Sequence, residues 1–192
     1  MKAARRAVTI SPSFSGTHTL YMSDINQKQG KVETCWVQLL AGTDSQGMPV
    51  LEKLEVKRHE QEGTYELLHS PLFVRDLAAG DVFNCEDDNP ASYTVIKRSG
   101  KLAVRVFCKD NPEELEAKLT PEVEKLDGSL DLKTDRALVY SVHVNIGFGE
   151  IERLFDNAIA DTQGPIWYYG NIYDRDDGVT PLNWWDEFIN QV

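Results

Sequence analysis

The change in hydrophobic period near Asn111 constrains the fold of this chain more than any other feature of its sequence. Before Asn111, apolar residues come in short runs that are separated by turn residues, as in "KVETCWVQLLAG", and this pattern is typical of strands. After Asn111, two stretches place apolar residues at helical spacing, with further strand patterns between and after them. The sequence therefore predicts an α+β protein.

Residues 31–98 are predicted to form a small, β-barrel-like antiparallel part. Short strand patterns follow one another there, and turn clusters such as "GTDSQGMP" and "CEDDNPAS" separate them. Many short strands at such spacing are typical of a small coiled barrel. Residues 1–30 are polar and show no sustained period, so we expect an irregular N-terminal arm with one short strand over Thr17–Met22.

Residues 99–173 are predicted to form a ferredoxin-like part with the element order β-α-β-β-α-β. "YTVIKRSGKLAVRVFC" is expected to be a hairpin or bent strand pair that folds at Ser99 and Gly100. Asn111 is expected to cap the first helix, and Pro121 to kink or restart it. "GEIERLFDNAIADTQG" has the pattern of a second amphipathic helix, and "PIWYYGNIY" is the final strand. Two helices would then cover one face of a four-stranded antiparallel sheet, which packs with the first part as one unit.

Residues 174–192 are predicted to form an aromatic and acidic C-terminal clasp. The stretch "YDRDDGVTPLNWWDEF" fails as an EF-hand, because setting Gly178 at loop position 6 places Tyr173 and Arg175 where acids are required. "DRDDG" is typical of a turn, and the rest of a short helix. Trp184 and Trp185 cannot face the same way on a helix, so we expect Trp184 as the exposed residue, with the reverse assignment left open.

The charge of the chain is unevenly distributed. The net charge is −11, and residues 111–192 contain 17 acidic against 6 basic residues. Such a field repels phosphate backbones, so we expect a basic protein partner rather than nucleic acid, although acidity that serves only solubility is the alternative. The sequence shows neither a membrane-spanning apolar stretch nor an apolar signal-peptide region, so we expect no membrane association and a cytoplasmic location.

No catalytic residue, metal site or cofactor is predicted. Cys35, Cys85 and Cys108 are widely spaced and lack a C-x-x-C pair, so they are expected to be small buried thiols. The four histidines form no metal-binding pair at helical spacing, and no G-x-S-x-G or P-loop pattern is present. An oxygen site built from Asp174, Asp176 and Asp177 is the one metal alternative left open.

The stretches "FVRDLAAGDVF" and "YTVIKRSGKLAVRVF" together resemble the signature of the bacterial family called domain of unknown function 4265. The resemblance extends over about residues 31–170, with "CWVQLLAG" similar to the opening strand of the family. It implies a small cytosolic bacterial protein of no established activity, and some members are suspected to be immunity proteins that are encoded beside toxins.

These observations lead to one functional hypothesis and two alternatives. We expect a non-enzymatic, acidic immunity protein that binds and neutralises a cognate toxin acting in the cytosol, such as a nuclease, because carboxylates complement a basic cleft. The alternatives are a regulatory small-molecule-binding domain and an enzyme without a recognisable motif. The residues expected to bind the partner are Asp174, Asp176, Asp177, Trp184, Asp186, Glu187, Glu150, Glu152 and Asp156.

Overall fold

The computed structural model describes residues 33–85, 89–160 and 164–189. The chain divides into residues 1–31 and residues 32–192, and every element below belongs to the second unit. The predicted N-terminal arm and its strand over Thr17–Met22 lie outside the described residues. Within the described ranges, no helix has both the length and the apolar character needed to cross a membrane.

The first half of this unit forms a five-stranded antiparallel sheet in the order β1-β2-β3-β4-β5. This sheet is open, so the expected barrel is not closed, although the Leu40 amide donates to the Pro90 carbonyl at 2.8 Å and draws β1 toward the start of β5. The strands are β1 (Thr34–Thr43), β2 (Pro49–Arg58), β3 (Thr64–Leu67), β4 (Val82–Cys85) and β5 (Tyr93–Lys97).

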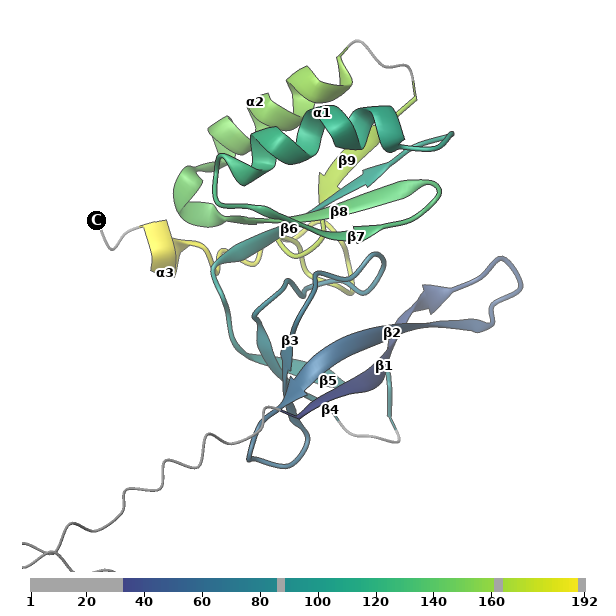
Figure 1. Ribbon diagram of the computed structural model, residues 1–192. Coiled ribbons are helices and arrows are strands. Elements are labelled where there is room, and N and C mark those ends of the chain that lie inside the picture. The colour runs from purple at the N-terminus through teal and green to yellow at the C-terminus, as the bar shows by residue number, and fades with distance from the viewer. Residues whose placement is uncertain (1–32, 86–88, 161–163, 190–192) are drawn as a thin grey trace, which may run out of the picture. The chain divides into compact units, whose positions relative to one another are not determined.

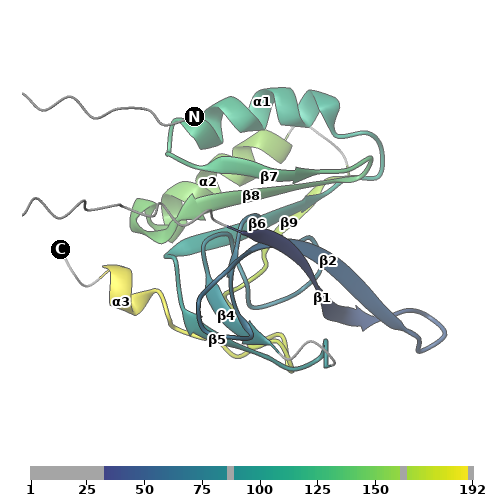
Figure 2. The ribbon, with the colours of Figure 1, turned by 60° about the horizontal axis from the view of Figure 1, so that its bottom comes forward.

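The second half forms a four-stranded antiparallel sheet in the order β7-β8-β6-β9, and two long helices cover one face of it (Figure 1). The predicted element order, strand-helix-strand-strand-helix-strand, is found. Figure 2 shows the helices, this sheet and the strands of the first sheet as successive layers. The elements are β6 (Lys101–Phe107), α1 (Glu113–Glu124), β7 (Ser129–Lys133), β8 (Ala137–His143), the 3-10 helix η1 (Val144–Ile146), α2 (Phe148–Ile159), β9 (Ile166–Tyr169) and α3 (Asp186–Ile189).

The strands β5 and β6 belong to different sheets, so the hairpin expected at Ser99 and Gly100 is not formed. The Ser99 amide instead donates to the Asp81 carboxylate at 2.8 Å. Gly100 has a φ of +82°, which turns the chain into β6. These two residues therefore connect the sheets.

Helix α1 runs through Pro121 without a break, so the helix does not restart there. It begins at Glu113, and the Asn111 side chain accepts a hydrogen bond from the Glu113 amide at 3.2 Å. Leu119 and Val123 are fully buried on either side of Pro121. Their burial offsets the one backbone hydrogen bond that proline cannot donate.

The central strands of the second sheet are covered on both faces. Leu102 and Val104 alternate along β6 with Ala103 and Arg105, and all four are buried. The helices cover the first pair, while the connection between β3 and β4, residues 68–81, covers the opposite face. This connection starts and ends in the first sheet and therefore joins the two sheets into one packed unit.

Candidate functional site

Arg105 and Glu52 hold the segment 71–74 between the two sheets. The Arg105 guanidinium on β6 donates to the carbonyls of Pro71 (3.0 Å), Phe73 (3.4 Å) and Val74. The Glu52 carboxylate on β2 accepts from the amides of Leu72 (2.6 Å), Phe73 (2.9 Å) and Val74 (2.7 Å). Both main-chain polar groups of Phe73 are thus bonded, which fixes the position of its side chain.

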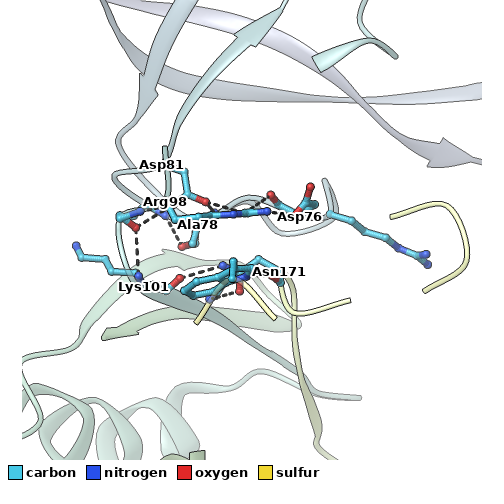
Figure 3. Close-up of polar contacts among 12 residues, drawn as sticks. Asp76, Ala78, Asp81, Arg98, Lys101 and Asn171 are labelled. Carbon is cyan, nitrogen blue, oxygen red and sulfur yellow. Dashed lines mark hydrogen bonds and ion pairs between the residues drawn. The ribbon is translucent and has the colours of Figure 1, made fainter. Parts of the chain in front are cut away.

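A second polar network ties the same connection to the start of β6 (Figure 3). The Arg98 guanidinium lies between the carboxylates of Asp76 and Asp81. Burial raises the pKa of Asp81, and the hydrogen bond from Ser99 and the charge of Arg98 act in the opposite direction. Below them, the Asn171 side chain accepts from the Ala103 amide and donates to the Lys101 carbonyl. We infer a structural role for this network, because its groups satisfy one another.

The C-terminal segment packs on the second network and reverses the expected roles of the two tryptophans. Trp184 is only 9% exposed, and its indole N–H donates to the Asn171 carbonyl at 2.7 Å. Arg98 lies over its ring, 5.5 Å from the centroid. Trp185 is half-buried and packs against Phe148 with ring centroids 5.3 Å apart. The expectation that Trp184 is an exposed anchor is therefore wrong, because its N–H satisfies a buried carbonyl.

The aspartates of the turn 174–180 mostly bond to their own backbone. Asp174 accepts from the Asp176 amide at 2.8 Å, and Asp177 accepts from the amides of Val179 (2.8 Å) and Thr180 (2.9 Å). The hydrogen bond from the Thr180 side chain, followed by these backbone hydrogen bonds, lowers the pKa of Asp177. In the ranges that the structure describes, no three His, Cys, Asp or Glu side chains are placed to hold a metal ion. Asp176 and Asp177 are exposed, and Asp174 is half-buried.

The other acids predicted to bind a partner lie on two helices, α2 and α3. Asp186 and Glu187 are exposed in the first turn of α3. On α2, Glu150 pairs with Arg153 at 2.5 Å, and Asp156 accepts from the indole N–H of Trp167 at 2.9 Å. Glu152, one turn before Asp156, is exposed as well.

Four large exposed apolar or aromatic side chains gather where β9, the segment 71–74 and the C-terminal turn meet. We call them the aromatic surface. They are Phe73 (48% exposed), Ile166 (61%), Tyr168 (42%) and Tyr173 (43%).

Phe107 supports this surface from within. Its ring stacks on Tyr168 with centroids 5.6 Å apart and contacts Phe73 at 6.2 Å. Phe73, Tyr168 and Tyr173 also line a hollow of about 420 Å³, together with Arg75 and Asp174. Aromatic residues and arginine are the residue types that anchor protein interfaces, so this arrangement can bind a partner.

The predictions from sequence missed this surface. The sequence could have marked Arg105 as a residue of interest, because it is the one charge within the apolar run "LAVRVF" of a central strand. The exposure of Ile166 and Tyr168 could not be predicted, since "IWYY" is apolar on both faces and does not indicate which face a distant segment covers. Phe73 lies in a loop, where no periodicity reports burial.

Comparisons with known proteins identify a family and a fold. A family model described as "Domain of unknown function (DUF4265)" matches residues 52–165, more than half of the chain. A solved structure described as "a hypothetical protein from Neisseria gonorrhoeae" is similar, with a TM-score of 0.55 and 17% sequence identity over 72% of this chain and 94% of that chain. At this identity the likeness concerns the fold alone. No curated protein matched the sequence.

Proposed function

The chain belongs to the DUF4265 family, whose description assigns no activity, and from this premise we propose that it is a non-enzymatic protein that binds another protein through the aromatic surface. The observation that carries the proposal is the exposure of four large apolar or aromatic side chains in one place. A folded protein that leaves such side chains in contact with water loses the free energy of their burial. Exposed patches of this kind mark interaction sites.

The position of Phe73 supports the proposal. Its side chain is half exposed, yet its amide and carbonyl are bonded to Glu52 and Arg105. An aromatic side chain on a rigid backbone loses little conformational entropy when it binds, so more of its contact energy contributes to affinity.

The charge distribution favours a basic protein as the partner. The exposed carboxylate of Asp176 lies on the turn that follows Tyr173, and Glu152 is exposed on α2, on the other side of β9. Acidic groups around an apolar centre attract a basic partner before contact and orient it. In its specific form, the proposal is that the protein acts in the cytoplasm as an immunity protein and that the partner is a toxin.

The small-molecule alternative has one observation in its favour. The hollow of about 420 Å³ beside Tyr168 falls within the size range of ligand pockets. The donors of Arg105 that line it are occupied by the carbonyls of Pro71, Phe73 and Val74. The protein-binding proposal therefore accounts for more of the exposed groups.

We also propose that residues 101–169 form a ferredoxin-like part. The antiparallel order β7-β8-β6-β9 and the two helices on one face support this assignment. An experimental structure that places α1 and α2 on opposite faces of the sheet would contradict it.

Variants that remove side chains of the aromatic surface test the proposed function. The double variant Phe73→Ala/Tyr173→Ala is used to capture partners from the native cell, beside the unchanged chain. A matched control, Met48→Ala/Ile96→Ala, removes two other exposed apolar side chains. We expect one basic protein to bind the unchanged chain and the control, and to bind the test variant about tenfold or more weakly, as for interface anchors.

Purified components then distinguish the forms of the proposal. Co-expression of the captured protein with the chain should relieve growth arrest if that protein is a toxin. Equal binding by the test variant and the control would refute the proposed surface. If the captured protein is harmless to the cell, protein binding stands and the immunity function does not.

A further inference from the structure

The strand β9 is an edge of its sheet, with β6 as its strand neighbour. The Gly170 amide donates to the Ala103 carbonyl at 2.7 Å, and the register pairs Arg105 with Tyr168. Hydrogen-bonded pairs alternate along an antiparallel ladder, so Tyr168 bonds to β6. The main-chain groups of Trp167 and Tyr169 therefore point to the free edge, where the described residues add no further strand.

This edge lacks most of the features that prevent strands from pairing. The opposite edge strand, β7, contains Asp131 and Lys133, and a bulge interrupts its register after Leu130. The strand β9 reads Ile-Trp-Tyr-Tyr, without a charge, a proline or a bulge. Its length of four residues is its single protection. An edge of this kind can accept another strand.

The two sides of the edge differ in chemistry. On one side lie Ile166 and Tyr168 of the aromatic surface. On the other side lies α2, where Asp156 accepts from the Trp167 indole. Glu152 lies one helical turn before Asp156 and therefore on the same face of α2. Burial first, and then the charges of these two carboxylates, raise the pKa of Tyr169. A strand that lies along the edge would therefore meet apolar groups on one side and carboxylates on the other.

We propose that the partner adds an extended strand to the free edge of β9, with alternating apolar and basic side chains. The apolar side chains contact Ile166 and Tyr168, and the Lys or Arg side chains contact Glu152 and Asp156. A second copy of the chain fits less well, because pairing through β9 would place two α2 helices with their carboxylates side by side. This inference rests on the proposed function and specifies its mode of binding.

A synthetic peptide of three Lys-Val repeats with blocked ends tests the inference on the full chain. We expect it to slow the hydrogen exchange of the Trp167 and Tyr169 amides by roughly tenfold or more, since they gain partners. The amides of Ile166 and Tyr168 should change less, because they already bond to β6. Methylating the peptide nitrogens at the lysines or at the valines should abolish the effect in one of the two versions, because a strand presents alternate amides to its neighbour.

Variants separate strand addition from simple charge attraction. Ile166→Lys should abolish the protection, as an edge charge does, whereas the control Ile96→Lys, on β5, should retain it. The double variant Glu152→Gln/Asp156→Asn should weaken the binding of the Lys-Val peptide by about tenfold. The binding of a Thr-Val peptide, which carries no basic side chains, should stay unchanged.

Three results would overturn the inference. The first is that none of these peptides protects the Trp167 and Tyr169 amides. The second is that both methylated versions bind as well as the parent peptide. The third is that the two amides are protected in the free chain together with dimerisation, which would show that a second copy occupies the edge. In each of these cases, the proposed function is judged separately by the Phe73→Ala/Tyr173→Ala variant. If that variant binds the captured partner more weakly than the unchanged chain does, the proposed function stands without this mode of binding.

Discussion

Arg105 is the residue on which the contact between the two sheets most depends. It is 2% exposed in the centre of β6, and burial lowers the pKa of its guanidinium. A β-carbon at Gly170 would lie 2.6 Å from the Arg105 guanidinium carbon, so only glycine leaves room for this side chain. The chain accepts a buried cation because three carbonyls of the segment 71–74 accept its hydrogen bonds.

Replacing Arg105 should therefore destabilise the protein strongly. The substitution Arg105→Met keeps the volume and leaves the carbonyls of Pro71 and Val74 buried without donors, at a cost of about 3–5 kcal/mol. Urea unfolding measures the loss. Arg153→Met, which removes an exposed arginine, is the control and should change the free energy of unfolding by less than about 0.5 kcal/mol. Equal losses for the two variants would contradict the role assigned to Arg105.

At the scale of elements, two adjacent tryptophans pack the C-terminal segment against different parts of the protein. Trp184 is buried between Arg98 and Asn171, while Trp185 packs against Phe148 at the start of α2. The two tryptophans face different ways, as expected, but they lie in the turn before α3 and not within the helix that was predicted for them. Which of them faces inward depends on the Asn171 carbonyl, which lies on a separate segment.

Truncation of the two tryptophans should separate their contributions. Trp184→Ala should lower the free energy of unfolding by about 3–5 kcal/mol, because it creates a cavity and leaves the Asn171 carbonyl without its donor. Trp185→Ala should cost roughly half as much, since its side chain is partly exposed. Thermal or urea unfolding of both variants gives the comparison. A larger loss for Trp185→Ala would show that the packing described here is wrong.

At the scale of the whole described unit, the segment 68–81 makes the two sheets mutually dependent. It connects β3 and β4 of the first sheet, yet Leu72 packs against Ala137 and Val139 of the second. The Glu52 and Arg105 contacts reinforce this from both sides. The segment 68–81 therefore packs against both sheets, and neither sheet has a separate cover on this side.

We expect the two sheets to unfold in one transition. Residue-resolved hydrogen exchange in denaturant should give the same free energy of opening for Val56 of β2 and Val139 of β8, since each sheet loses its cover when the other unfolds. The variant Arg105→Met should lower both values together. If the Val56 value falls while the Val139 value stays, the sheets fold independently and the junction is not the source of cooperativity.

The sequence by itself determined what depends on neighbours along the chain. Apolar spacing predicted the strands and both long helices, Gly100 predicted a change of direction, and the acids of "DRDDG" predicted a turn. These features follow from local backbone geometry and side-chain period, which a short stretch contains in full. They account for the element order but not for the function.

Only the tertiary structure decided which surfaces are open and which are covered. It left the first sheet open instead of closing it as a barrel, buried Trp184, and exposed Phe73 and Tyr168 beside a free strand edge. Each outcome depends on segments far apart in the sequence, as when Glu52 and Arg105 meet on the loop between them. Burial is a property of contacts between such segments, and no local pattern specifies which segment will cover a given face.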